Sequence, residues 1–262
     1  MKLMVRRVLM LMEREWYRVS ADLVRFILYQ VIIWPVLFAV STVYFSGLSL
    51  FGEQSAMQAT TMFLGVALMH YMVISFYQTF PFLKERTIQH IVQYHVSVTS
   101  YASMFWARYL FGVLFAYLLS VPYMFIAKLV LGDRLYTVHL NWFLLVGMQF
   151  ILTAFLVAYI FLCIGTLTSM NNVGSTWKRV LEPLMWIGGM WAPGYAMCQA
   201  FPRTAFLIKL NPFYYATEAI RQVVLRSDKF LPLSISCTVL VGMTVVCVAA
   251  SYFVMRHRLQ ML

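Results

Sequence analysis

The chain alternates between long uncharged apolar runs and short polar segments. A transmembrane helix needs roughly 20 consecutive apolar residues. Charged residues at the centre of such a helix cost about 2.5–3.5 kcal/mol each, so charged clusters indicate where the chain leaves the membrane. The pattern predicts six spanning helices, at about 26–46, 57–82, 109–127, 142–167, 181–201 and 230–255.

Residues 3–19 have a different pattern, in which apolar and charged side chains occupy opposite faces of a helix. The apolar face holds Val5, Val8, Leu9, Met12, Trp16 and Val19. The polar face holds Lys2, Arg6, Arg7, Glu13, Arg14 and Arg18. Because a spanning helix follows almost at once, we predict an amphipathic helix that lies in the membrane surface. A cytosolic packing helix is the alternative.

Two of the apolar runs contain features that modify a simple spanning helix. The uncharged stretch 135–177 is strongly apolar only over 142–167, so we predict one span followed by a cytoplasmic loop that ends at Lys178 and Arg179. The fifth run, 181–201, contains Gly188-Gly189 and Pro193-Gly194. These residues predict a kinked or unwound segment within the span.

Two polar segments separate the spans. Residues 84–108 are compatible with a helix and are predicted to be cytoplasmic. Residues 202–229 carry seven ionisable side chains, which no continuous span can accommodate. Short apolar stretches at 204–208 and 213–216 lie between these charges. This pattern predicts a re-entrant or interfacial helical hairpin on the outer side of the membrane, just before the last span.

Composition supports the same class of protein. The chain of 262 residues is 62% hydrophobic and 11% charged, whereas soluble domains carry roughly 25% charged residues. We therefore predict an all-α polytopic membrane protein, with a single transmembrane domain over residues 1–262. With both termini cytoplasmic, 13 of the 20 Lys and Arg residues lie inside, as the positive-inside rule requires. The net charge of +11 is thus explained by topology and anionic lipid headgroups, not by nucleic acid.

Candidate catalytic groups are scarce. His70 is the one histidine inside a predicted span and has no carboxylate in that span, so we interpret it as a hydrogen-bonded packing residue. His90 and His95 lack metal-ligand spacing. The sequence contains no HExxH, GxSxG or GxxxxGK[ST] motif. It therefore predicts no catalytic residue, no metal site and no nucleotide-binding loop in this chain.

Glu182 stands where the fifth predicted span begins. Lys178 and Arg179 precede it by four and three residues, which is the spacing of ion pairs along a helix. We predict a surface ion pair at the cytoplasmic end of span five. A role of Glu182 in substrate handling is the alternative.

Two local motifs resemble the ABC-2 class of ABC transporter permeases, the type 2 exporters. Residues 84–92, KERTIQHIV, with Ser97 and Arg108 after them, are similar to the family segment "ERe.GTleqLlvsPvs" between spans two and three. Residues 210–221, LNPFYYATEAIR, are similar to the "lNPl.y..EalR" signature before the last span. The chain departs from the first pattern in lacking its glycine and in having His95 where the family has proline.

The resemblance implies two functional segments. The first would couple this chain to an ATPase and comprises Lys84, Glu85, Arg86, Thr87, Ile88, Gln89 and His95. The second would form an outer gate and comprises Asn211, Pro212, Tyr215, Glu218 and Arg221. Asparagine can cap a helix whose first residue is proline. Glu218 and Arg221 are three residues apart and would pair on one face of that helix.

The resemblance also implies a function. The chain would be the transmembrane subunit of an exporter in the bacterial inner membrane, moving an amphipathic or lipid-linked substrate. It would form a homodimer in contact with membrane lipids, and two copies of a soluble ABC ATPase would bind ATP and Mg. A polysaccharide export permease is the first alternative, and a membrane-embedded lipid-modifying enzyme is the second. A third alternative is a scaffold subunit that transports nothing.

Overall fold

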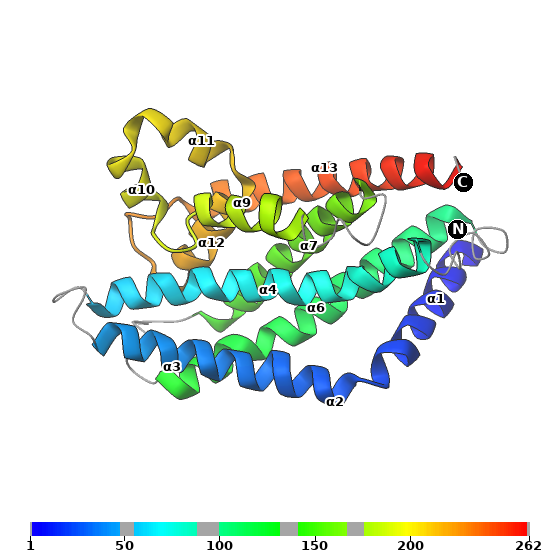
Figure 1. Ribbon diagram of the computed structural model, residues 1–262, viewed down its shortest axis with the longest axis horizontal. Helices are drawn as coiled ribbons and strands as arrows, with labels where there is room; N and C mark the ends of the chain where they lie inside the picture. Colours follow the sequence, from blue (N-terminus) through cyan, green and yellow to red (C-terminus); the bar gives the residue numbers. More distant parts are fainter. Residues whose placement is uncertain (1, 48–54, 88–99, 132–140, 167–175, 261–262) are drawn as a thin grey trace.

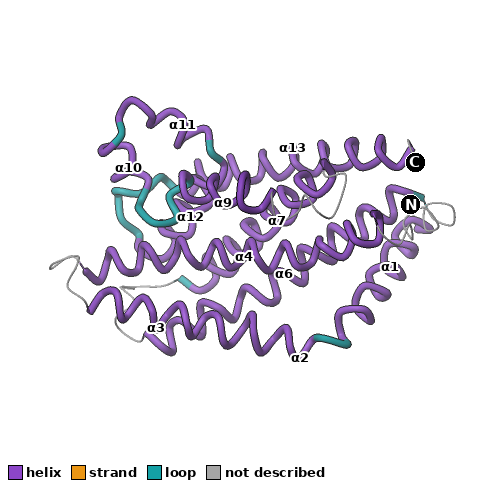
Figure 2. Tube along the Cα trace, in the orientation of Figure 1, coloured by secondary structure: helices purple, strands orange, loops and turns teal. Residues whose placement is uncertain are grey.

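A computed structural model of the protein describes residues 2–47, 55–87, 100–131, 141–166 and 176–260. Every regular element in these ranges is helical, and loops join several neighbouring elements (Figure 2). The elements are α1 (Lys2–Ser20), α2 (Leu23–Phe26), η1 (Ile27–Ile33), α3 (Trp34–Gly47), α4 (Ser55–Thr87), α6 (Tyr101–Leu131), α7 (Trp142–Thr166), η4 (Trp177–Leu181), α9 (Glu182–Ile187), α10 (Gly194–Ala200), η5 (Pro202–Thr204), α11 (Ala205–Leu210), α12 (Pro212–Leu225) and α13 (Leu233–Gln260).

Five helical stretches in the described residues are long and apolar enough to cross a membrane. They are Leu23–Ser41, Thr60–Thr79, Tyr101–Leu129, Trp142–Cys163 and Leu233–His257. Each overlaps a predicted span. The all-helical prediction is confirmed for the described residues, and these five stretches fit a multi-pass membrane protein.

The long helices lie side by side in an elongated bundle (Figure 1). Helices α4, α6 and α7 contact one another, α13 packs along α7 and α12, and α1 packs against α6. The core contains large buried side chains from α4, α6, α7 and α12, such as Phe63, Tyr71, Tyr123, Phe155 and Phe213. The start of α1 and the end of α13 lie at the same end of the bundle, whereas α10 and α11 lie toward the other end.

Helices α4 and α6 are longer than the apolar runs that predicted them. Helix α4 continues to Thr87, beyond the predicted end of the second span at about residue 82. Helix α6 begins at Tyr101, so residues 101–108 belong to the third long helix and not to a separate polar segment. With 33 and 31 residues, they span about 50 and 46 Å at 1.5 Å per residue. The apolar part of a spanning helix matches the hydrocarbon core of about 30 Å, and the polar ends of the helix extend beyond that core.

The segment predicted as the fifth span is not one continuous helix. Helix α9 ends at Ile187 and α10 begins at Gly194, so the chain is unwound where the glycine and proline pairs predicted a break. Gly189 has φ +89°, a conformation that glycine adopts without steric cost. With 6 and 7 residues, neither helix is long enough to cross a membrane alone.

Helix α1 has the predicted bounds, but its apolar face serves two purposes. Val19 is buried in the cluster that includes α6, and Met12 packs against the same cluster. Val5, Leu9 and Trp16 remain exposed beside them. This exposed strip fits contact with the membrane surface, where tryptophan is favoured.

Candidate functional site

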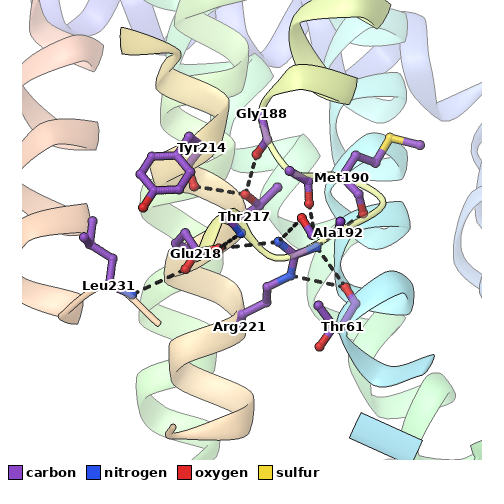
Figure 3. Close-up of polar contacts among 11 residues, drawn as sticks. Thr61, Gly188, Met190, Ala192, Tyr214, Thr217, Glu218, Arg221 and Leu231 are labelled. Atoms are coloured by element: carbon purple, nitrogen blue, oxygen red, sulfur yellow. Dashed lines mark hydrogen bonds and ion pairs between the residues drawn. The ribbon is translucent and has the colours of Figure 1, made fainter. Parts of the chain in front are cut away.

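A buried polar cluster, which we call the Arg221 node, joins α12 to the unwound segment before it. Glu218 and Arg221 lie one turn apart on α12, and only 1% and 0% of their surfaces are exposed. Around them lie backbone groups of Thr61, Gly189, Met190, Ala192, Gly194 and Leu231 (Figure 3). These groups come from α4, from the 188–193 turn with α10, and from the link to α13.

The start of α12 fixes the position of the node. The side-chain oxygen of Asn211 accepts a hydrogen bond from the Phe213 N–H at 3.0 Å, and Pro212 occupies the first turn, which confirms the predicted cap. The Asn211 amide also donates to the carbonyl of Leu184, near the end of α9. The Tyr215 hydroxyl donates to the Lys209 carbonyl at 2.9 Å and ties α12 to α11. Asn211 and Tyr215 thus hold three short helices together.

Arg221 donates hydrogen bonds to four carbonyl groups. Its Nη2 lies 2.6 Å from the Gly189 oxygen and 3.3 Å from the Met190 oxygen, and its Nη1 lies 3.3 Å from the Ala192 oxygen. Its Nε and Nη2 both donate to the Thr61 oxygen of α4, at 3.2 and 3.1 Å. An unwound turn leaves carbonyls without helical partners, and burying them unpaired is costly. The arginine supplies the missing donors.

Glu218 supplies the acceptor for the same turn. Its Oε1 accepts from the Gly194 N–H at 2.9 Å, at the start of α10, and its Oε2 accepts from the Leu231 N–H at 3.4 Å. The same Oε1 lies 3.6 Å from Arg221 Nη1, so the predicted ion pair between these two residues is confirmed. Each buried charge is therefore balanced by the other and by backbone groups, as a buried ion pair requires.

Close backbone contacts wedge the 188–193 turn between α4 and α12. A Cβ atom at Gly65 of α4 would lie 1.8 Å from the Met190 carbonyl oxygen, so only glycine permits this approach. From α12, the Thr217 hydroxyl donates to the Gly188 carbonyl at 2.6 Å. Sequence reasoning did not find Gly65, because a single glycine in an apolar run does not reveal which backbone will approach it.

A second buried charge cluster, which we call the Glu15 cluster, joins α1 to α6. Glu15 is 2% exposed, and its carboxylate lies 2.7 Å from Arg14, 2.7 Å from Arg18 and 3.5 Å from Arg108 of α6. Burial raises the pKa of Glu15, whereas the nearby guanidinium groups, foremost that of Arg108, lower it. The second effect is larger, so the pKa of Glu15 lies below its ordinary value. One weak signal of this burial is present in the sequence, since Glu15 falls between Met12 and Val19 on the apolar face.

The remaining predicted site residues have mixed outcomes. Lys84, Glu85, Arg86 and Thr87 are the last residues of α4, while Ile88, Gln89 and His95 lie outside the described residues. The prediction of an ion pair between Glu182 and Lys178 or Arg179 is wrong within the described chain. Both basic side chains are exposed in the π-helix η4, and Glu182 follows as the first residue of α9.

His70 has the packing role that the sequence predicted. Its Nε2 lies 2.8 Å from the Gln30 backbone oxygen, which links α4 to η1, and its ring packs beside Tyr123. Within the ranges that the structure describes, no three metal-ligating side chains lie together.

Changing Asn211 tests how the cap contributes to the site. We expect Asn211→Ala to lower the free energy of unfolding by about 0.5–2 kcal/mol, because the capping oxygen is lost. Asn211→Asp is the matched control: it keeps the capping oxygen but loses the amide that donates to Leu184. Chemical unfolding in detergent micelles would compare them. Equal stability of Asn211→Ala and the parent protein would contradict the capping role.

Comparison with protein-family models, with curated proteins and with solved structures found no significant match to this chain. Within the described residues, the geometry defines a class: a helical protein with five apolar helices that fit a multi-pass membrane protein, and with a buried ion pair beside an unwound segment.

Proposed function

We propose that the chain is the transmembrane subunit of an ATP-driven ABC-2-type exporter that moves an amphipathic or lipid-linked substrate out of the cytoplasm or inner leaflet. The observation that carries the proposal is the Arg221 node. It anchors the unwound segment to the helix that begins with the NPFYYATEAIR motif. Fixed non-helical backbone at membrane depth is tolerated only where protein or a water-filled cavity surrounds it. Such a place suits a gate.

The proposed topology has six passages through the membrane. Five are the apolar helices, and the sixth is the broken segment formed by η4, α9 and α10. The start of α1 and the end of α13 lie at one end of the bundle in Figure 1, and an even number of passages accounts for this. The distribution of Lys and Arg supports a cytoplasmic position for that end. Helices α11 and α12 then form the re-entrant hairpin at the outer side.

The proposed energy source is a separate ATPase in two copies, bound to a homodimer of this chain in a bacterial inner membrane. An ATPase in the cytoplasm can act only on chain that leaves the membrane. The end of α4 with the coupling residues Lys84–Thr87, and α1, provide such handles at the same end of the bundle. The Glu15 cluster would pass a movement of α1 directly to α6. Substrate would then move between the two copies as the helices rock, with the outer hairpins opening.

Reconstitution with the ATPase tests the proposal. The protein would be co-expressed with a candidate ATPase from the adjacent reading frame, purified and placed in lipid vesicles. We expect a stable complex and ATP-dependent movement of a fluorescent amphipathic lipid analogue. The Glu85→Ala/Arg86→Ala double variant is expected to keep the fold but reduce coupled transport at least about tenfold, as loss of a charged docking contact does. Arg203→Gln is the control at the outer side.

Two results would contradict the proposal. One is the absence of any complex together with transport that the double variant leaves intact. The other is the absence of ATP-dependent flux for every amphipathic or polymeric glycan substrate offered, which would favour a scaffold subunit.

A further inference from the structure

A polar cavity lies beside the first membrane helix, apart from the Arg221 node. It has a volume of about 360 Å³ and opens between α2, η1, the start of α3 and the later half of α4. Six of its lining residues are Asp22, Arg25, Phe26, Tyr29, Trp34 and Tyr77. Because α2 follows directly after α1, which we predict to lie in the membrane surface, we expect the cavity to open at the depth of the headgroups on that side of the membrane.

Two opposite charges stand at its rim. Asp22 and Arg25 are exposed and three residues apart, but among the described residues neither side chain has an ion-pair or hydrogen-bond partner. Asp22 is the N-cap residue of α2, yet its carboxylate does not cap the helix. Both charges are therefore available to a ligand that carries a cation and an anion a few ångströms apart.

The aromatic residues give the cavity its walls. The rings of Phe26 and Tyr77 meet edge to face, with centroids 6.1 Å apart, and connect α2 to α4. Trp34 and Tyr29 are partly exposed beside them. Aromatic side chains with a polar tip are favoured at the membrane interface, and ring faces attract ammonium groups.

Gln30 lines the cavity and contributes an acceptor without a donor. Gln30 is only 8% exposed, and within the described chain its Oε1 accepts no hydrogen bond. Its backbone carbonyl is occupied separately by His70. Gln30 lies in the π-helix η1, a local widening that is frequent at functional sites. A buried acceptor without a donor is costly, so a ligand that brings an N–H group is favoured.

We propose that this cavity binds the headgroup of a zwitterionic aminophospholipid, phosphoethanolamine in chemical terms. The phosphate would pair with Arg25, and the ammonium would donate to Asp22 and to Gln30 Oε1. The acyl chains would follow the exposed apolar side chains of Leu28 and Ile32 along η1. An anionic headgroup without an ammonium leaves Asp22 facing negative charge. A choline headgroup has no N–H to give to Gln30. This lipid site does not depend on the proposed export function.

The test measures how many donors the headgroup must carry. Purified full-length protein in detergent would be titrated with phosphatidylethanolamine, its N-monomethyl and N,N-dimethyl derivatives, phosphatidylcholine and phosphatidylglycerol, and bound lipid counted by native mass spectrometry. We expect phosphatidylethanolamine to bind about tenfold more tightly than phosphatidylcholine, with the methylated lipids in between, because each methyl group removes one donor. Phosphatidylglycerol is expected to bind no better than phosphatidylcholine.

Variants locate the site. Gln30→Met is expected to abolish the preference over phosphatidylcholine, and Asp22→Asn and Arg25→Gln to weaken phosphatidylethanolamine several-fold. Gln30→Glu keeps an acceptor and is expected to retain the preference. Asp228→Asn and Arg203→Gln change charges near the other end of the bundle and are expected to change nothing. If Gln30→Met fails to fold, the exposed variants Asp22→Asn and Arg25→Gln still decide whether the headgroup binds in this cavity.

Equal binding of all the lipids, or a preference that the cavity variants leave intact, would overturn the proposal. Tighter binding of phosphatidylglycerol would do so as well, because Arg25 alone would then explain it. None of these results depends on the presence of an ATPase, so failure of the lipid site and failure of the exporter proposal are distinguishable.

Discussion

Replacing Arg221 by glutamine is expected to lower the free energy of unfolding by about 3–5 kcal/mol, the usual effect of removing one partner of a buried ion pair. The variant leaves Glu218 as an uncompensated buried carboxylate. It also removes donors from the carbonyls of Thr61, Gly189, Met190 and Ala192. Chemical denaturation in detergent micelles, followed by tryptophan fluorescence, would measure the loss.

Three further variants separate charge from hydrogen bonding at this position. Arg221→Lys keeps the charge but not the planar fork of donors, so we expect a smaller but definite loss. The double variant Glu218→Gln/Arg221→Gln removes both charges and is expected to be more stable than the sum of the single effects predicts. Arg203→Gln, at an exposed arginine of η5, is the control and should fall within about 0.5 kcal/mol of the parent. A similar stability of Arg221→Gln and Arg203→Gln would refute the structural role of the node.

Replacing Glu15 by glutamine is expected to detach α1 from α6 and to lower the free energy of unfolding by about 3 kcal/mol, because it removes the buried carboxylate that pairs with Arg108 across the two helices. Glu13→Gln is the matched control, since Glu13 is exposed on the same helix. Limited proteolysis near Ala21, where α1 ends, would report detachment directly. Cleavage at the same rate in both variants would contradict this role of Glu15.

The same cluster predicts a pH dependence. The pKa of Glu15 is lower in the folded protein than its ordinary value, so the carboxylate stabilises the fold at pH values above the unfolded pKa of about 4.3. That contribution is lost as the pH falls through the lower, folded pKa. We therefore expect the difference in stability between the parent protein and Glu15→Gln to be constant near neutrality and to shrink below about pH 4. A difference that persists unchanged at pH 3 would contradict the assignment.

Much of the fold could be predicted because lipid imposes strict requirements on the chain. Apolar runs of sufficient length had to become helices, and the most apolar part of the uncharged stretch 135–177 forms α7. Local residue patterns were also predictive: the Gly188-Gly189 and Pro193-Gly194 pairs indicated the break, and Asn211-Pro212 indicated the start of α12. Each of these signals acts within a few residues of the chain, where sequence is informative.

The candidate sites were predictable only in part. The pair Glu218–Arg221 could be anticipated because its members are one helical turn apart. The carbonyl groups that Arg221 binds come from positions up to 160 residues away, and no local pattern connects them. Glu15 and Arg108 are also far apart in sequence, separated by 93 positions. The π-helix η4, in which Lys178 and Arg179 lie, was likewise not predicted from the sequence.

The hydrophobic pattern by itself determined that the chain is helical, roughly where its apolar helices lie and where one of them breaks. Only the tertiary structure decided which partners the buried charged side chains have, and without such partners burial of these charges would be unfavourable. Arg221 is buried because the unwound turn offers carbonyls, and Glu15 is buried because α6 offers Arg108. The physical reason is that a buried charge needs partners within about 3–4 Å, and those partners are brought together by packing rather than by sequence neighbourhood.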